Sequence, residues 1–338
     1  MELEQVIKDI NKKIKVGKID FGVKYEKLER IPFSSCRLNY TTYGGVPVGR
    51  ITELAGSESA GKTTLCLDLV GQAQKKYKDK KVLFVDIERT FDSEWATKLG
   101  VDIEKLIYFD TDSSSAEEVF NTIIELAKTG EISLIVLDSL GQMVSLQANE
   151  KQIGEKTYGG ISMALTEFSK KITPILARTK TALIGINQVR EDMNSMYGRT
   201  ITTGGRAWRH SCSMRLECRQ GNFIDEKGNA LSKMCENPVG QEITVRMVKS
   251  KVCKADRRIG KCTLNYLAGI DYIGDLVDTA TKYGIIDKKG AWFNLVDTET
   301  GEITNKFQGK AQICEFLAEN EKELQKIQKQ IEQTQEKE

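Results

Sequence analysis

The nine residues from Gly56 to Thr64 constrain the fold more than any other stretch of the sequence. They read Gly-Ser-Glu-Ser-Ala-Gly-Lys-Thr-Thr and match the phosphate-binding pattern G-x-x-x-x-G-K-[ST]. Glycines let the backbone turn its N–H groups toward phosphate oxygens, a lysine supplies positive charge, and a threonine hydroxyl can bind Mg²⁺. We therefore predict a nucleoside triphosphate site whose phosphate loop consists of Gly56, Ser57, Glu58, Ser59, Ala60, Gly61, Lys62, Thr63 and Thr64.

The sequence around this loop has the pattern of a parallel α/β sheet. Residues 50–55 alternate like a strand, and residues 64–70 continue like a helix whose N-terminal dipole would face the phosphates. Continuous apolar runs follow at 81–86, 134–138 and 181–187, separated by helical stretches. Such runs are typical of strands in a parallel sheet that helices cover on both faces.

Polar side chains follow these runs, where open parallel sheets bind their ligands. Asp138 ends one run and fits the acid that holds Mg²⁺ through water, the alternative being a strand-end cap. Glu88, just beyond Asp86, is the candidate base for activating water, although a surface carboxylate would look the same. Gln188 directly follows the third run. We expect the nucleotide to be ATP, because no Asn/Thr-Lys segment continues to the x-Asp that reads guanine.

Composition narrows the remaining classes of function. The net charge is only +2, so any nucleic-acid contact must come from local basic patches. The single histidine, His210, makes a zinc site or a histidine-based triad improbable. No secretory segment and no apolar run of bilayer length is present, and the eight cysteines form no C-x-x-C pair. These features favour a cytoplasmic protein with reduced thiols and no membrane partner.

Two segments rich in Gly and Thr are too long for plain connections in a compact core. They cover residues 149–160 and 189–205, and they hold basic residues together with Tyr158, Met193 and Tyr197. A basic, flexible loop with apolar side chains suits single-stranded nucleic acid, because cationic groups contact phosphates while apolar groups stack on bases. A lid over the nucleotide is an equally good interpretation of the residues alone.

The remaining regions are expected to be smaller elements. Residues 1–16 form an amphipathic helix that either covers its own domain or docks on a neighbouring protomer. Strands are predicted at 214–218 and 242–248, with an exposed hairpin between them. A small α/β appendage begins near Gly269, and residues 320–338 read as a solvated helix or a fraying tail.

Several motifs together resemble the bacterial RecA recombinase family. They are the phosphate loop, Val-Asp-Ile-Glu-Arg-Thr-Phe-Asp, Leu-Ile-Val-Leu-Asp-Ser-Leu, Gly-Ile-Asn-Gln-Val-Arg, Thr-Thr-Gly-Gly-Arg-Ala and Val-Lys-Ser-Lys, and the similarity extends from about residue 45 to about 317. The resemblance implies a RecA-like P-loop NTPase core with a mostly parallel central sheet. It also implies an N-terminal helical oligomerisation segment (1–30), a core with two DNA-binding loops (31–267), a small C-terminal α/β domain (268–320) and a charged tail (321–338).

For the nucleotide, the resemblance implies Mg-ATP on the residues named above, with catalysis by Glu88. Asp92 and Trp95 stand where the family contacts adenine, with Trp95 in place of a tyrosine. Gln188 would sense the γ-phosphate and signal to the loop that follows it. Lys249 and Lys251 match the basic pair that reaches ATP bound by the adjacent protomer, stabilising transition-state charge in trans.

For DNA, the resemblance makes residues 149–160 and 189–205 the two DNA-binding loops. The expected partners are single-stranded DNA, homologous duplex DNA and further copies of the chain in a helical filament, with the N-terminal helix packed on its neighbour. The contacts would come from Tyr158, Gly159, Lys170, Arg190, Met193, Tyr197, Thr203, Gly204 and Gly205.

The chain also departs from the family pattern. Tyr158 replaces a methionine, Met193 an isoleucine and Asp192 a lysine, the second loop is one residue shorter, and the 220–241 region is longer. The leading hypothesis is a DNA-dependent ATPase that exchanges strands in recombination, DNA-damage repair and the SOS response. A ring-shaped helicase or translocase on the same core is the alternative, and a non-catalytic ATP-binding mediator is a third hypothesis.

Overall fold

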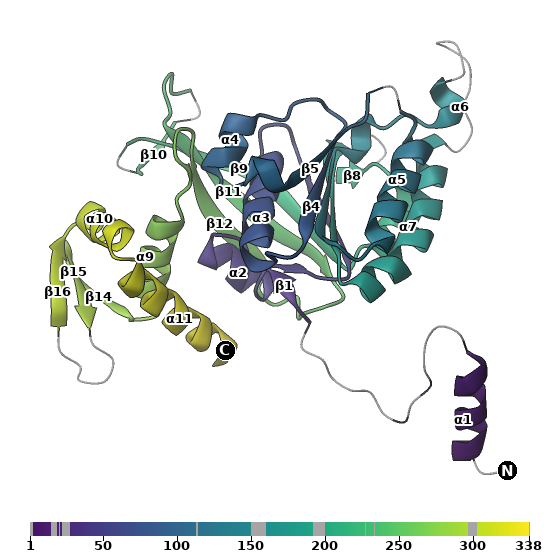
Figure 1. The fold of residues 1–338 in the computed structure, drawn as a ribbon. Helices are drawn as coiled ribbons and strands as arrows, with labels where there is room; N and C mark the ends of the chain where they lie inside the picture. Colours follow the sequence, from purple (N-terminus) through teal and green to yellow (C-terminus); the bar gives the residue numbers. More distant parts are fainter. Residues whose placement is uncertain are drawn as a thin grey trace.

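A large, mostly parallel sheet forms the centre of the molecule (Figure 1). The structure, a computed structural model, describes residues 3–14, 19, 21, 28–112, 114–149, 160–191, 200–226, 228–232, 234–296 and 303–337. Across the sheet of these residues the strands are, in order, β13 (Gly269–Ile270), β12 (Ile259–Asn265), β11 (Gly240–Ser250), β9 (Met214–Ile224), β3 (Ile51–Gly56), β7 (Ala182–Glu191), β6 (Ile132–Asp138), β4 (Lys81–Asp86) and β5 (Leu106–Asp110). Two short strands, β8 (Thr200–Thr202) and β10 (Ala230–Leu231), pair with β7 and β9.

The six strands from β9 to β5 are parallel, whereas β11, β12 and β13 continue the sheet antiparallel. The alternating strand predicted at 50–55 is β3, the three apolar runs are β4, β6 and β7, and the predicted fold class is confirmed. The register places Gly56 beside Gln188 and Asp86 beside Asp138, so the carboxyl ends of these strands meet along one edge.

Helices cover both faces of the sheet, as the continuous apolar strands predict (Figure 1). On one face α2 (Cys36–Thr42), α3 (Lys62–Lys76), α4 (Ser93–Lys98) and the antiparallel pair of β1 (Arg30–Ile31) and β2 (Val46–Pro47) share one apolar core cluster. The other face packs against α5 (Ala116–Lys128), α7 (Gly160–Thr179) and α8 (Gly205–Ser211), with Phe120 stacked on Phe168 at 4.3 Å between ring centroids. Short helices at η1 (Ile103–Lys105), η2 (Leu140–Gln142) and α6 (Leu146–Asn149) complete the connections.

Strands β9 and β11 are longer than the sequence predicted. Strand β9 continues to Ile224 and β11 already starts at Gly240, so some residues expected in an exposed hairpin belong to the sheet. The N-terminal helix α1 (Leu3–Lys13) is present as expected. None of its residues is buried and it lies apart from the sheet in Figure 1, so it does not cover the core of its own chain.

The C-terminal part forms a separate small unit around its own apolar cluster. It consists of α9 (Tyr272–Lys282), the antiparallel strands β14 (Ile286–Lys289), β15 (Trp292–Val296) and β16 (Ile303–Gln308), α10 (Lys310–Glu319) and α11 (Glu321–Lys337). The segment predicted to be a solvated helix or a tail is helical, but Ile327 and Ile331 of α11 are buried in this cluster. Helix α11 is therefore part of the small unit's core.

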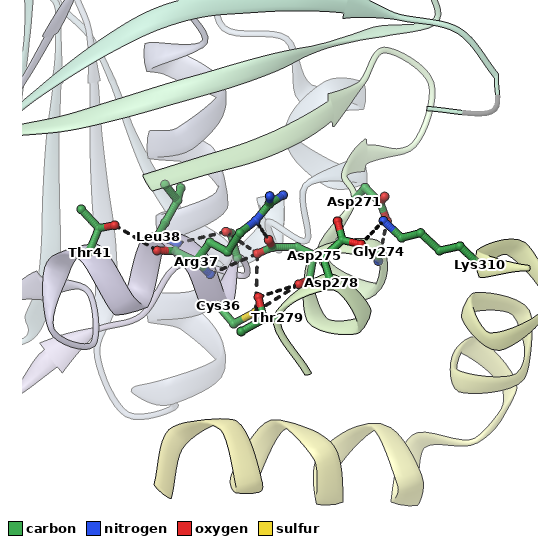
Figure 2. Close-up of polar contacts among 11 residues, drawn as sticks. Cys36, Arg37, Leu38, Thr41, Asp271, Gly274, Asp275, Asp278, Thr279 and Lys310 are labelled. Atoms are coloured by element: carbon green, nitrogen blue, oxygen red, sulfur yellow. Dashed lines mark hydrogen bonds and ion pairs between the residues drawn. The ribbon is translucent and has the colours of Figure 1, made fainter. Parts of the chain in front are cut away.

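Polar contacts between α2 and α9 join this unit to the sheet domain (Figure 2). The buried Asp275 carboxylate pairs with the Arg37 guanidinium and accepts a hydrogen bond from the Ser35 hydroxyl at 2.5 Å. The Cys36 thiol lies 3.1 Å from the Thr279 hydroxyl in the same contact. A buried carboxylate needs such donors, so this cluster fixes the small unit against α2.

Candidate nucleotide site

The predicted phosphate loop lies between the end of β3 and the start of α3, where its glycines are required by close packing. A Cβ on Gly56 would lie 2.5 Å from the Cys218 carbonyl oxygen, and a Cβ on Gly61 would lie 2.4 Å from Cδ1 of Ile243. Gly61 also has a φ of +82°, a left-handed conformation that glycine adopts without strain. The phosphate loop therefore packs directly against strands β9 and β11, and α3 begins at the next residue, Lys62.

The two side chains expected to bind phosphate and metal start α3. The Thr63 hydroxyl donates a hydrogen bond of 2.6 Å to Oδ2 of Asp138, at the end of β6. The Lys62 ammonium donates one of 2.6 Å to the Ser57 carbonyl, within the loop. The structure thus brings together the lysine, the threonine and the strand-end acid that the sequence singled out.

Burial dominates the electrostatics of Asp138, which is 3% exposed. It raises the pKa of this carboxyl to about 6, with smaller contributions from the Glu88 and Asp86 charges, although the Thr63 hydrogen bond and the Lys62 charge lower it. Keeping the buried Asp138 carboxylate charged costs free energy, and a nearby cation would reduce this cost.

The hydroxyl and carboxylate fit Mg²⁺, which prefers oxygen ligands and is usually held by one or two carboxylates with substrate phosphates and water. No group of three or more His, Cys, Asp or Glu side chains that could hold a metal occurs among the described residues. Thr63 and Asp138 would therefore be the protein's contribution to a metal that the nucleotide and water also bind.

Glu88 and Gln188 lie beside this pair. The backbone N–H groups of Ile87 and Glu88 both donate to the Asp138 carbonyl, at 2.7 and 3.2 Å, and the Ser139 hydroxyl donates to Oε1 of Glu88. These contacts hold the Glu88 carboxylate next to the end of β6. Gln188 pairs in register with Gly56 across β7 and β3, so it stands at the first residue of the phosphate loop.

Lys62, Thr63, Asp138, Glu88 and Gln188 all line one cavity of about 650 Å³, a size that suits a small-molecule ligand. The residues predicted from the sequence that line this cavity are Glu58, Ser59, Ala60, Gly61, Lys62, Thr63, Thr64, Glu88, Trp95, Asp138 and Gln188. Asp92 is the N-cap of α4, and its carboxylate accepts a hydrogen bond of 2.9 Å from the backbone N–H of Trp95. Asp92 thereby fixes the start of the helix that carries Trp95 to the cavity.

Sequence reasoning missed five further lining residues, Gln220, Phe223, Gln241, Leu264 and Tyr266. The first three belong to the region read as an exposed hairpin. Gln241 pairs with Phe223 while Ile243 pairs with Gln220, so β9 holds one extra residue at this point. This β-bulge shifts the alternation and turns both Gln220 and Phe223 to the same face. Alternation alone cannot reveal a bulge, although Gly221 in a strand is a weak signal for one.

Lys249 and Lys251 lie at a different place in the chain. Both ammonium groups donate to the His210 carbonyl at the C-terminal end of α8, at 3.2 and 2.6 Å, and Lys249 also donates to the Arg209 carbonyl. Cations at this end of a helix are stabilised by its dipole. Burial lowers the pKa of Lys249, and the Lys251 charge adds to this effect. Neither lysine lines the cavity of its own chain.

The residues expected to bind DNA are placed only in part. Tyr158, Gly159, Met193 and Tyr197 lie outside the described residues. Arg190 pairs with Ile201 between β7 and β8, Thr203 follows β8, and Gly204 and Gly205 start α8. Gly204 has a φ of +96° and packs on Leu165 of α7. Lys170 is exposed farther along α7.

A buried carboxylate links the strands beneath these flanks. Glu53 of β3 is fully buried, and its Oε1 accepts hydrogen bonds of 3.0 Å from the Asn187 amide and 3.0 Å from the Trp208 indole. The Arg215 guanidinium pairs with its other oxygen. The Asn187 amide also donates to the Thr203 carbonyl at 2.9 Å. Through Glu53, strand β3, which leads into the phosphate loop, therefore contacts residues on both sides of 192–199: Asn187 before this range, and Trp208 and Arg215 after it.

Comparisons with known proteins agree with this geometry. The model of the RecA N-terminal domain matches residues 1–271, and that of the RecA C-terminal domain matches residues 274–336. The chain is 34% identical over 329 residues to a Protein RecA of Thermus aquaticus, covering 96% of this chain and 92% of the relative. It is 33% identical to a Protein RecA of Aquifex pyrophilus, covering 97% and 90%, and 33% identical to one of Ureaplasma parvum, covering 88% and 84%. Among the described residues, no helix has both the length and the apolar content needed to cross a bilayer. This chain belongs to the RecA family of recombinases, whose members bind ATP and DNA in recombination and repair.

Proposed function

We propose that this protein is a DNA-dependent ATPase that forms a helical filament on single-stranded DNA in the cytoplasm. It would pair the bound strand with homologous duplex DNA and exchange strands, while DNA stimulates its ATP hydrolysis. One observation carries the proposal. Lys62, Thr63, Asp138, Glu88 and Gln188 line a single cavity in a chain whose family consists of recombinases.

The residues of the cavity divide the work of ATP hydrolysis. Lys62 would leave the Ser57 carbonyl to bind the β- and γ-phosphates, and the loop N–H groups would bind the remaining phosphate oxygens. Thr63 and Asp138 would hold Mg²⁺, which, when bound, neutralises charge that develops on the phosphates. Glu88 would orient a water molecule and accept its proton, because contacts to Asp138 and Ser139 hold its carboxylate at the end of β6.

Gln188 and its neighbours support a coupling between ATP and DNA. Gln188 lines the cavity, and the preceding residue, Asn187, donates a hydrogen bond to the Thr203 carbonyl. A change at Gln188 on ATP binding would thus be felt at both flanks of the proposed second DNA loop, since β7 leads directly into it. Lys249 and Lys251 would act on ATP held by a neighbouring protomer, which makes hydrolysis depend on filament assembly.

A single set of assays tests the proposal. ATP hydrolysis is measured with and without single-stranded DNA, and the same samples are imaged for helical filaments. We expect DNA to stimulate hydrolysis and filaments to form only with ATP and Mg²⁺. Lys62→Ala should abolish both, whereas Lys80→Ala, which changes a lysine far from the cavity that donates to the Thr179 carbonyl, should retain both. Closed rings in place of open helices would favour a helicase or translocase, and DNA-independent hydrolysis by monomers would refute the proposal.

A further inference from the structure

The side-chain amide of Gln241, a residue outside the phosphate-loop pattern, hydrogen-bonds to the backbone of that loop. Gln241 of β11 is 4% exposed, and its Nε2 donates a hydrogen bond of 3.0 Å to the Ser59 carbonyl. Its Oε1 accepts two hydrogen bonds, from Nε2 of Gln220 at 2.6 Å and from the Tyr266 hydroxyl at 3.1 Å. The Gln241 amide is therefore fixed at both ends, and only its nitrogen faces the loop.

The bonded carbonyl belongs to a strained part of the loop. Ser59 has a φ of +57°, a left-handed conformation that is costly for a residue with a Cβ and persists only when surroundings enforce it. In a trans peptide the C=O and the following N–H point in opposite directions. A Ser59 carbonyl held toward β11 thus turns the Ala60 N–H away from β11. Phosphate loops bind their ligand through such inward N–H groups.

We propose that Gln241 is a positioning residue for nucleotide binding. It holds the Ser59–Ala60 peptide in the orientation that binds phosphate, and Gln220 and Tyr266 keep its amide turned the right way. The inference rests on the proposed function, since it concerns the same cavity. It assigns a role to the 220–241 region, because the bulge in β9 turns Gln220 to the face where its side chain hydrogen-bonds to Gln241.

The test compares nucleotide affinity in matched variants. Gln241→Met keeps the length of the side chain and its lack of charge but removes the donor. We expect roughly a tenfold rise in the Kd for fluorescent methylanthraniloyl-ADP with Mg²⁺, the effect of one hydrogen bond. The KM for ATP should rise similarly while kcat at saturation stays within about twofold, because the loop is restored once nucleotide is bound. Gln220→Met, which leaves the Tyr266 contact, should raise the Kd by less.

The matched control is Gln74→Met. The Gln74 amide donates to the Asp102 carbonyl at 2.9 Å and accepts from the Asp102 N–H at 2.8 Å, at the far end of the same helix α3. This variant should lose stability without a change in Kd. Equal Kd values for Gln241→Met and wild type, or an equal rise in Kd for Gln241→Met and Gln74→Met, would overturn the inference.

The proposed function and the role of Gln241 can be refuted separately. If wild type itself does not bind the nucleotide, the proposed function fails, and the inference fails with it. If wild type binds, Lys62→Ala does not and Gln241→Met binds normally, only the role of Gln241 is refuted. Should Gln241→Met not fold, the double variant Gln220→Met with Tyr266→Phe removes both donors that orient the amide. It must then show the rise in Kd.

Discussion

The charge of Asp138 should make the nucleotide-free protein less stable at neutral pH, and its removal should therefore stabilise the fold. Burial raises the pKa of this carboxyl from 3.8 to about 6. A shift of about two pKa units corresponds to about 3 kcal/mol of unfolding free energy, at 1.36 kcal/mol per unit. Asp138 is nearly inaccessible to solvent, so screening by water does not reduce this figure substantially.

The direction of the pH dependence follows from the sign of the shift. The folded-state pKa lies above the unfolded value, so the protonated carboxyl contributes stability that is fully present below pH 3.8 and is lost as the pH rises through about 6. The substitution Asp138→Asn mimics the protonated form, and the oxygen of the introduced amide can still accept the Thr63 hydrogen bond. The variant should exceed wild type by about 3 kcal/mol at pH 8 and by roughly half of that at pH 5.

Urea unfolding from pH 5 to 8, without nucleotide or Mg²⁺, measures this difference. Burial also raises the pKa of Asp68 to about 6, but this contribution is common to both chains and cancels in their comparison. With MgADP added, wild type should gain stability and Asp138→Asn should gain much less, because its neutral amide binds the metal weakly. A variant less stable than wild type at pH 8, or a difference that does not grow with pH, would refute the reasoning.

Three further changes test other parts of the structure. Gly61→Ala places a methyl group 2.4 Å from Ile243 Cδ1 at a φ of +82°, so nucleotide titration should show no binding, with a loss of about 1–3 kcal/mol in urea unfolding. Asp275→Ala leaves Arg37 without its buried partner and should lower the unfolding free energy by about 3 kcal/mol, whereas an unchanged urea midpoint would contradict the role of this pair. Glu88→Gln should lower kcat by about 100-fold or more in a DNA-stimulated ATPase assay while the Kd for ADP stays constant.

The sequence was most informative where local chemistry alone determines structure. Continuous apolar runs predicted β4, β6 and β7, because strands buried on both faces of a parallel sheet need no alternation, whereas β3 was predicted from alternation before the phosphate loop. The phosphate loop was equally clear, since its glycines are required by contacts that a Cβ would make with Cys218 and Ile243. The polar residues at the strand ends could be expected to meet, because adjacent parallel strands end at the same edge of the sheet.

Features that depend on non-local register could not be predicted. The extra residue in β9 turns Phe223 toward the cavity, and it becomes visible only in the pairing of β9 with β11. The burial of Ile327 and Ile331 was missed for a related reason. Two isoleucines four residues apart in a charged helix form a narrow apolar stripe, and whether it is covered depends on helices that pack from elsewhere in the chain.

Glu53 shows how a violation of the apolar pattern can point to a functional contact. A charged residue in the middle of a buried strand requires donors nearby, because an unpaired buried carboxylate would be too costly in free energy. The donors that the fold supplies come from β7, α8 and β9, through Asn187, Trp208 and Arg215. A shift of any one of these elements relative to β3 would break a contact to the buried carboxylate, so the carboxylate couples their positions. The strand that enters the phosphate loop and the strand that carries Gln188 are thereby tied into one unit, and Asn187 connects this unit to the Thr203 carbonyl. In the proposed coupling, a change at Gln188 would therefore reach residue 203 through this unit.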